Sequence, residues 1–368
     1  MPMKRFTVLF LLISLIFSGC ATWMDGQYHS VTPHINQSSR AEKEITAVSN
    51  YDDICNALED MVSSAVESGI LSSESYDTNR LESSMARAIQ HIKETFPLGA
   101  FAVEDISYEI GTFRGMSAVA VTILYNHNRD MLQRIPHVNG TKPARSLINL
   151  ALSHCDSSLV MYVENYSDMD YLQFVRDYGL QQPAYLMELP QVTVAQYPES
   201  GTVRVIELQF IYQNSRTSLQ NMQNYVQPVF SSAALYVSNE SDENTKFELL
   251  YSFLMERHGY SIETSITPAY SLLRHGVGDS KAFASVYAAM CRRANLDCQV
   301  IYGTKDGEPW FWNIIKANGG YCHVDLINSY FSDQFQKRGD SQMEGYVWDY
   351  SAYPPCIAPT EEATDGTD

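Results

Sequence analysis

The 368-residue sequence is poor in basic residues: 25 lysines and arginines stand against 43 aspartates and glutamates, so the net charge is −18. This imbalance argues against nucleic acid and against an anionic lipid surface as electrostatic partners. The sequence also lacks a C-x-x-C pair, and its two Cys–His neighbours are single dipeptides without the spacing of a metal site. We therefore expect no nucleic-acid partner, no metal and no cofactor.

No apolar run approaches the roughly 20 residues that a membrane-spanning helix needs. The run FTVLFLLISLIF, residues 6–17, follows Lys4 and Arg5 and has the length of a signal-peptide core. It leads into FSGC, and small residues directly before Cys20 are typical of a bacterial lipobox, although Phe17 stands where leucine is usual. These features predict a lipoprotein signal peptide over 1–19; an ordinary secretory signal is the alternative.

Acyl chains on Cys20, palmitate among them, would anchor the mature protein to a bacterial membrane on the side facing away from the cytoplasm. Loss of Lys4 and Arg5 makes the mature charge −20 (−18 minus 2). The polar stretch over 20–44 reads as a tether, and the acidic stretch over 356–368 reads as a solvated tail. Six further cysteines leave their pairing open, with buried thiols and disulfides equally favoured.

The middle of the sequence contains two similar stretches. Each has helical runs, then two alternating apolar runs joined by turn residues, then a further helical run. We predict two helix–β-hairpin–helix units over 45–141 and 142–232. A shared ligand clamp of tyrosine and arginine is a functional alternative, but packing and capping are the favoured roles. The matched residues are Tyr125 and Tyr212 and likewise Arg129 and Arg216, each pair 87 apart, with Pro97 and Pro183 86 apart.

The last third of the sequence predicts a helix followed by an antiparallel sheet. Apolar spacing indicates a helix from Ser280 to about Arg293, preceded by a glycine-containing loop. A helix N-terminus favours an anion, so Ser280 stands where a nucleophile would benefit. Strand-like runs follow at 298–303, 310–316 and 321–327, and NGG after the second run indicates a hairpin turn. The run YVWDY adds a further strand candidate.

Residues 245–355 resemble the transglutaminase-like domain of the papain-like superfamily. The resemblance implies an α+β fold in which a core helix packs on an antiparallel sheet, with a Cys–His–Asp triad. GDSKAFA places Ser280 at the cysteine position, and WFWNII places Trp310 at the histidine position while keeping the Trp–Asn that follows. YCHVDLI keeps the aspartate, as Asp325. Two of the three catalytic residues of the family are thus replaced in this sequence.

Replacement of the catalytic cysteine and histidine predicts a domain without catalysis, because loss of either the nucleophile or the base removes most of an enzyme's catalytic rate. A serine hydroxyl needs a general base within hydrogen-bond reach, and the indole of Trp310 has no basic nitrogen. His323 and His275 are the candidates for a relocated base. Asp325, without its histidine, is expected to accept a hydrogen bond from a backbone N–H or from the Trp310 indole N–H.

Three functions follow from these residues. The favoured one is a binding or scaffolding module at the cell envelope for a peptide-like or cell-wall ligand. The alternatives are a hydrolase or acyl transferase that uses Ser280 with a relocated base, and a purely structural surface protein.

Overall fold

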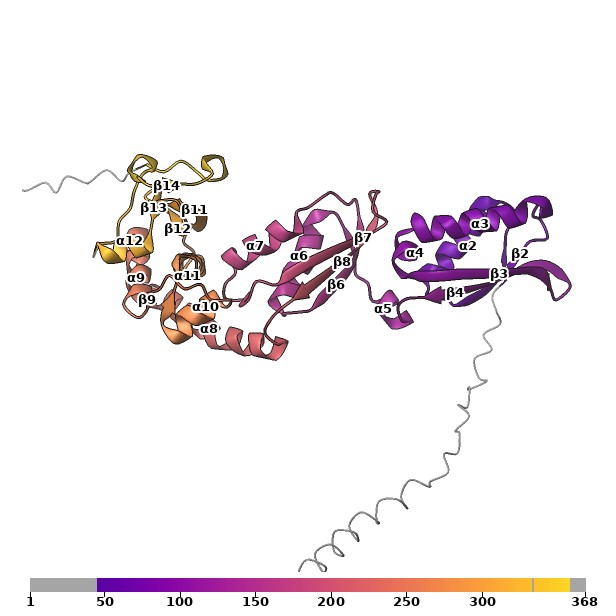
Figure 1. Cartoon of the computed structure of the whole chain (residues 1–368), viewed down its shortest axis with the longest axis horizontal. Helices are drawn as coiled ribbons and strands as arrows, with labels where there is room; N and C mark the ends of the chain where they lie inside the picture. The colour runs from indigo at the N-terminus through magenta and orange to yellow at the C-terminus, as the bar shows by residue number, and fades with distance from the viewer. Residues whose placement is uncertain (1–44, 333, 358–368) are drawn as a thin grey trace, which may run out of the picture. The chain divides into compact units, whose positions relative to one another are not determined.

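The computed structural model describes residues 45–332 and 334–357 (Figure 1). The predicted signal peptide, Cys20, almost all of the tether and most of the acidic tail lie outside these residues. The described part is an α+β structure with three four-stranded sheets and one two-stranded sheet. None of the helices within these ranges is long and apolar enough to cross a membrane.

The first sheet has the strand order β1-β2-β4-β3, and its core lies between the sheet and three helices. Helix α3 begins after the N-cap Asp77, whose side chain accepts the Asn79 N–H, and it turns apolar residues such as Met85 and Ile92 to the core. The elements are β1 (Ile45–Ala47), α2 (Tyr51–Ser63), β2 (Ser68–Ser72), α3 (Thr78–Glu94), α4 (Pro97–Ala102), β3 (Val103–Phe113), β4 (Met116–Tyr125) and α5 (Arg129–Gln133).

The second sheet has the order β5-β6-β8-β7, with a core that includes Ile148, Met161 and Phe210. Strand β5 lies in the range of the first predicted unit, but it pairs with β6 of the second sheet. The short strands β2 and β6 were not expected from the sequence. The elements are β5 (His137–Asn139), α6 (Thr141–Ser153), β6 (Ser158–Glu164), α7 (Tyr171–Gln181), β7 (Gln191–Tyr197), β8 (Arg204–Ile211) and α8 (Arg216–Tyr236).

The two N-terminal sheets have matching strand orders. Thr122 of β4 lies opposite Ser68, and Gln209 of β8 lies opposite Ser158; Thr122 and Gln209 are 87 residues apart (209 minus 122). This offset is the one that separates Tyr125 from Tyr212. The duplication itself stays a prediction, which superposition of the two sheets would test.

One tyrosine and one arginine of the two stretches make polar contacts with other elements, whereas the Tyr212 hydroxyl is buried without a hydrogen-bond partner among the described residues. The Tyr125 hydroxyl donates to the carbonyls of Met61, at 3.2 Å, and Val66, at 3.0 Å. The Arg216 guanidinium lies 2.7 Å from Asp156. These contacts are those of packing and helix-entry residues, the roles that the sequence favours over a ligand clamp.

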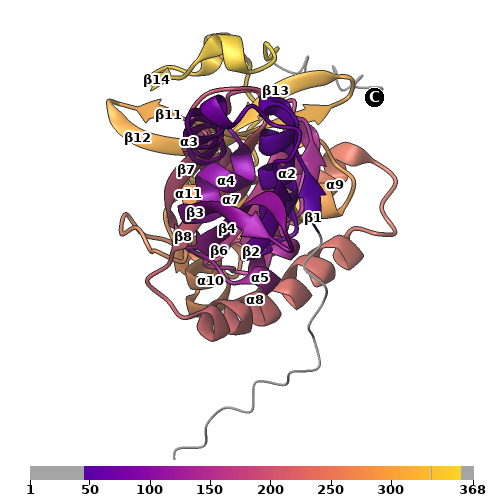
Figure 2. The ribbon, with the colours of Figure 1, turned by 90° about the vertical axis from the view of Figure 1, so that its right-hand side faces the viewer.

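The last third forms a helix packed on an antiparallel sheet of order β13-β12-β11-β14. Figure 2 shows the long pair β11 and β12 with β14 beside β11. The NGG turn joins β12 to β13, with Asn318 and Gly319 at φ 53° and 78°. The elements are α9 (Glu243–Met255), β9 (Gly259–Tyr260), α10 (Pro268–Tyr270), a π-helical turn (Ser271–His275), β10 (Val277–Gly278), α11 (Ser280–Arg293), β11 (Cys298–Lys305), β12 (Glu308–Ala317), β13 (Gly320–Val324), α12 (Leu326–Phe331), two 3-10 turns (Asp340–Gln342 and Tyr350–Ala352) and β14 (Tyr346–Val347).

Candidate functional site

Ser280 is the first residue of α11, as the sequence predicts. The helix begins there because Asp279 is its N-cap: the carboxylate accepts the Ala282 N–H at 2.9 Å. Gly278 lets the preceding loop approach the helix closely, since a Cβ at this position would lie 2.9 Å from the Ala282 Cβ. Nearly the whole helix is buried, so Ser280 is fixed on a rigid element.

The sheet presents Trp310, Trp312 and Asn313 on β12. The Asn313 amide donates to the Ala284 carbonyl of α11 at 2.9 Å, which ties the strand to the core helix. The Trp312 side chain is fully buried on the other face of the sheet, in a cluster with Tyr346 and Trp348. These two contacts give the Trp–Asn pair a structural role.

The carboxylate of Asp325 is saturated by donors. Its Oδ2 accepts the Trp310 indole N–H at 2.8 Å and the Tyr346 hydroxyl at 2.6 Å. Its Oδ1 accepts the backbone N–H groups of Ile327 and Asn328, each at 3.0 Å. A carboxylate has about four lone-pair sites, so these four bonds leave none to orient a further group.

Lys305 completes this network from β11. Its ammonium lies 3.6 Å from Asp325 Oδ2 and 5.0 and 5.2 Å from the ring centroids of Trp310 and Tyr346. The side chain of Asp325 is only 3% exposed, so the cation compensates a buried charge. Burial, followed by the charge of Asp325, raises the pKa of the Tyr346 hydroxyl, which therefore remains a hydrogen-bond donor.

The Ser280 hydroxyl has no base beside it. Within the described ranges Ser280 Oγ makes one hydrogen bond, in which it accepts the Phe311 backbone N–H at 3.3 Å. The contact places Ser280 next to the Trp310–Phe311 peptide, while the Trp310 indole N–H points to Asp325. An indole N–H is a donor without a free lone pair, so Trp310 cannot take a proton from the serine.

Of the two candidate relocated bases, His275 makes a ring contact and His323 has both ring nitrogens in hydrogen bonds. His275 packs edge-on against Tyr270, with ring centroids 5.5 Å apart. His323 Nδ1 accepts the Trp312 indole N–H at 3.0 Å, and its Nε2 lies 2.9 Å from Asp340 Oδ1. The sequence placed His323 and Asp325 on one face of a strand, but β13 ends at Val324 and Asp325 is the N-cap of α12.

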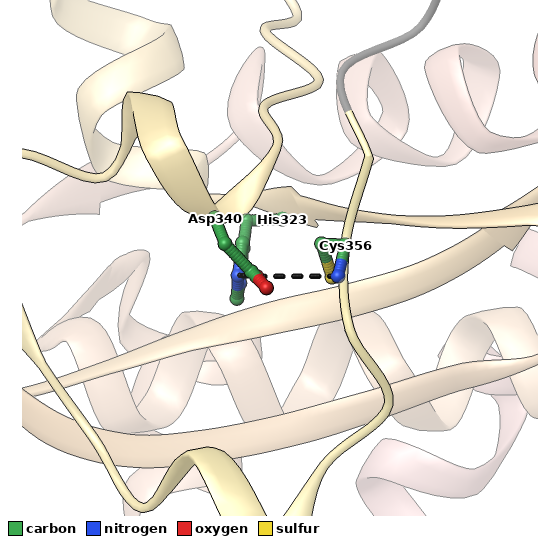
Figure 3. Close-up of side chains that lie close together, drawn as sticks. All are labelled: His323, Asp340 and Cys356. Carbon is green, nitrogen blue, oxygen red and sulfur yellow. Dashed lines mark hydrogen bonds and ion pairs between the residues drawn. The ribbon is translucent and has the colours of Figure 1, made fainter.

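His323, Asp340 and Cys356 form a second polar cluster, whose ligand atoms lie within 4.8 Å of one another (Figure 3). Asp340 Oδ1 also accepts the Cys356 backbone N–H at 3.2 Å. The Ile357 N–H donates to the Tyr321 carbonyl at 3.0 Å, so Ile357 is held against β13. We call these three residues the histidine cluster.

The donor set of the histidine cluster does not fit a metal in this arrangement. The Trp312 N–H occupies the Nδ1 lone pair of His323, so Nε2 must carry the proton that it shares with Asp340. A metal-binding imidazole needs a free nitrogen lone pair. Burial raises the pKa of the Cys356 thiol to about 12, so the thiol is also neutral and unreactive near pH 7.

Sequence reasoning missed Lys305 and Tyr346, which approach Asp325 from other strands. Neither residue belongs to a motif. Lys305 on β11 and Tyr346 on β14 are brought to Asp325 only because β11 pairs with both β12 and β14. The helix start at Asp325 could have been found, because an aspartate before a run such as LINSYF is an N-cap signal.

Comparison with known proteins agrees with this geometry. Residues 231–326 match the transglutaminase-like superfamily, so the chain contains a transglutaminase-like domain. The matched range holds Ser280, Trp310 and Asp325. No curated protein matches the sequence significantly.

Three solved structures that match the chain have little sequence in common with it. A TGase is 8% identical with a TM-score of 0.28 and covers 51% of this chain and 55% of its own. A candidate cysteine protease from Cytophaga hutchinsonii is 14% identical with a TM-score of 0.25, covering 40% and 65%. A candidate protease from Parabacteroides distasonis is 9% identical with a TM-score of 0.23, covering 66% and 42%. The chain thus spans less than two thirds of each of these proteins.

Proposed function

We propose that the protein is a membrane-anchored bacterial envelope lipoprotein whose transglutaminase-like domain binds or scaffolds a peptide-like or cell-wall ligand without catalysis. The observation that carries the non-catalytic part is the 2.8 Å bond from the Trp310 indole to Asp325. Trp310, whose indole cannot accept a proton, stands at the histidine position of the resemblance. Its N–H also binds Asp325, the residue that would orient such a histidine.

Energetics support the same conclusion. The end of a helix stabilises an anion by about 0.3–1 kcal/mol, and by about 2 kcal/mol when partly buried. One pKa unit corresponds to about 1.4 kcal/mol. The dipole of α11 therefore cannot by itself ionise the Ser280 hydroxyl at neutral pH, and a general base would be needed.

An acyl-group probe for serine and cysteine nucleophiles tests this part of the proposal. We expect no stoichiometric labelling of the native protein at Ser280. The variant Ser280→Cys should gain at most the slow reactivity of an ordinary thiol, because Trp310 still stands at the base position. Adding Trp310→His should raise that reactivity, because an imidazolium beside a thiol favours the thiolate.

Labelling of the native protein at Ser280 that is lost in Ser280→Ala and depends on His323 or His275 would overturn the proposal. Such labelling would establish a serine hydrolase or acyl transferase instead.

The anchoring part rests on FSGC and is tested separately by Cys20→Ala. We expect the variant to move from the detergent phase to the aqueous phase in a phase-partition experiment, while Cys55→Ala, a matched control, stays in the detergent phase. A Cys20→Ala protein that remains in the detergent phase would rule out the lipid anchor.

The binding part is tested by co-sedimentation of the soluble Cys20→Ala protein with purified cell-wall sacculi and, in parallel, by binding to immobilised envelope peptides. Retention on either material supports the binding module. If the protein is retained on neither material, the binding role is wrong and a purely structural role is favoured.

A further inference from the structure

A half-buried lysine lies on the side of α11 next to Ser280 and takes no part in the network at Asp325. Lys281 is the second residue of α11, and its side chain borders a pocket together with Ser285. Apolar residues form most of the pocket wall: Leu180, Leu186, Met187, Pro268 and Ala269. Arg176 of α7 also borders the pocket.

The two cations at this pocket have no carboxylate partner in the described parts of the chain. No aspartate or glutamate oxygen lies within 4.0 Å of either side chain, and neither donates a hydrogen bond there; the contact of Lys281 is with the Phe311 ring, at 5.9 Å. Lys281 differs from the many exposed cations that also lack such a partner, because its side chain is half-buried.

The environment of Lys281 disfavours its own charge. Burial lowers the pKa of its ammonium group, and the charge of Asp279 opposes this only in part. Arg176, an exposed cation, borders the same pocket. A bound anion would supply the missing counter-charge, whereas a neutral or cationic ligand would not.

The size and lining of the pocket restrict the anion. The accessible space is about 30 Å³, whereas roughly 10–15 Å³ on the same measure holds one water molecule. It admits a small polar head and leaves a longer chain outside. Leu189, which is 42% exposed, lies at the pocket and offers an apolar surface to such a chain.

We propose that this pocket binds a carboxylate that carries a short apolar chain, with Lys281 as the principal cationic contact and Arg176 as a second one. The carboxylate head pairs with the lysine, and the chain lies on the apolar wall towards Leu189. Two sources have this chemistry: a free short-chain acid and the C-terminus of an apolar peptide. The proposal is independent of whether Ser280 is catalytic.

Titration calorimetry with two acids and their amides tests the pocket. We expect butyrate or N-acetylalanine to bind at one site and their neutral amides not to bind. Lys281→Met should weaken binding at least about tenfold, as expected for loss of a charged contact. Lys316→Met, an exposed lysine on β12, should leave binding unchanged. Tighter binding of N-acetylalanine than of butyrate would identify a peptide C-terminus as the source.

Protection of the amine gives a readout that does not depend on a variant. Butyrate should slow the acylation of Lys281 by acetic anhydride, followed by peptide mass spectrometry, and should not slow that of Lys316. The proposal is wrong if butyramide binds as tightly as butyrate, if Lys281→Met retains full affinity, or if neither acid binds up to about 10 mM, a concentration that saturates a site of millimolar strength. None of these results alters the labelling expected at Ser280.

Discussion

The last third of the chain contains two polar clusters that differ in which of their hydrogen-bonding atoms are free. Ser280, Trp310 and Asp325 stand where the sequence resemblance places a catalytic triad, and only Asp325 has the residue type expected of it. The histidine cluster holds a cysteine, a histidine and an aspartate, the three residue types of such a triad. Neither cluster has a free imidazole lone pair beside a nucleophile.

The comparison shows that chemistry depends on which lone pairs are free and not on which residues are close together. At Asp325 four donors use the carboxylate completely. At His323 two neighbours use both ring nitrogens, and these bonds fix the tautomer. In both clusters saturated hydrogen bonds stabilise the fold, and the same saturation removes reactivity.

The largest loss of stability is expected on substitution of Asp325, because its carboxylate accepts four hydrogen bonds and pairs with Lys305. Asp325→Ala should lower the free energy of unfolding by about 3–5 kcal/mol, since it leaves Lys305 and two buried donors unpaired. Asp349→Ala is a matched control at another N-cap, which is exposed, and it should cost about 1 kcal/mol. Urea unfolding at pH 7 measures both. Equal losses in the two variants would show that Asp325 acts only as a helix cap.

A smaller loss is expected at the histidine cluster. His323→Ala leaves the Trp312 N–H without an acceptor and removes one of the two hydrogen bonds to Asp340 Oδ1, so it should cost about 2–3 kcal/mol in unfolding free energy. His323→Gln keeps one acceptor and one donor and should recover at least half of that loss. If the glutamine variant is as unstable as the alanine variant, the two hydrogen bonds are not the source of stability.

Some features of the fold and of the candidate site could be predicted from the sequence, and others could not. The span of α11 follows from apolar spacing and a capping aspartate, which are local signals. The Trp310–Asp325 bond follows from the resemblance, because two aligned positions imply proximity. Lys305 and Tyr346 could not be predicted, since their contacts depend on the register of β11 with β12 and β14. The engagement of His323 depends likewise on Asp340, in a turn that has no motif.

The strand expected over 346–350 is shorter in the structure, with β14 limited to Tyr346–Val347. Trp348 leaves the strand to pack edge-on against Trp312 and His323, at 5.7 and 4.8 Å between ring centroids. Burial of an aromatic ring thus outweighs the extension of a two-residue edge strand, and the local pattern contains no sign of that partner.

The dependence of stability on pH should distinguish the two clusters further. Burial lowers the pKa of His323, and the neighbouring Asp340 only partly counters this. The folded state therefore binds the proton less readily than the unfolded chain, where the pKa is about 6.5. The contribution of His323 is present above about pH 6.5 and is lost as the pH falls below it, by at most about 1.4 kcal/mol per unit.

Urea unfolding between pH 7.5 and 5 measures this slope, and His323→Gln is the control that cannot titrate. We expect the difference in stability between the two proteins to shrink as the pH falls. Parallel profiles would mean that His323 titrates with an unshifted pKa.

The smallest effect is expected from zinc, and it tests the tautomer at His323 directly. Zinc should not raise the melting temperature of the native protein through the histidine cluster, because Nε2 carries a proton while the Trp312 N–H occupies Nδ1. Trp312→Phe removes that donor, so the proton can move to Nδ1 and leave Nε2 free for a metal with Asp340 and Cys356. Although this change destabilises a buried site, the variant should gain a zinc-dependent increase in melting temperature that Cys356→Ser abolishes in the double variant. A comparable increase in the native protein, also abolished by Cys356→Ser, would show that His323 rearranges on metal binding and that the tautomer is not fixed by Trp312.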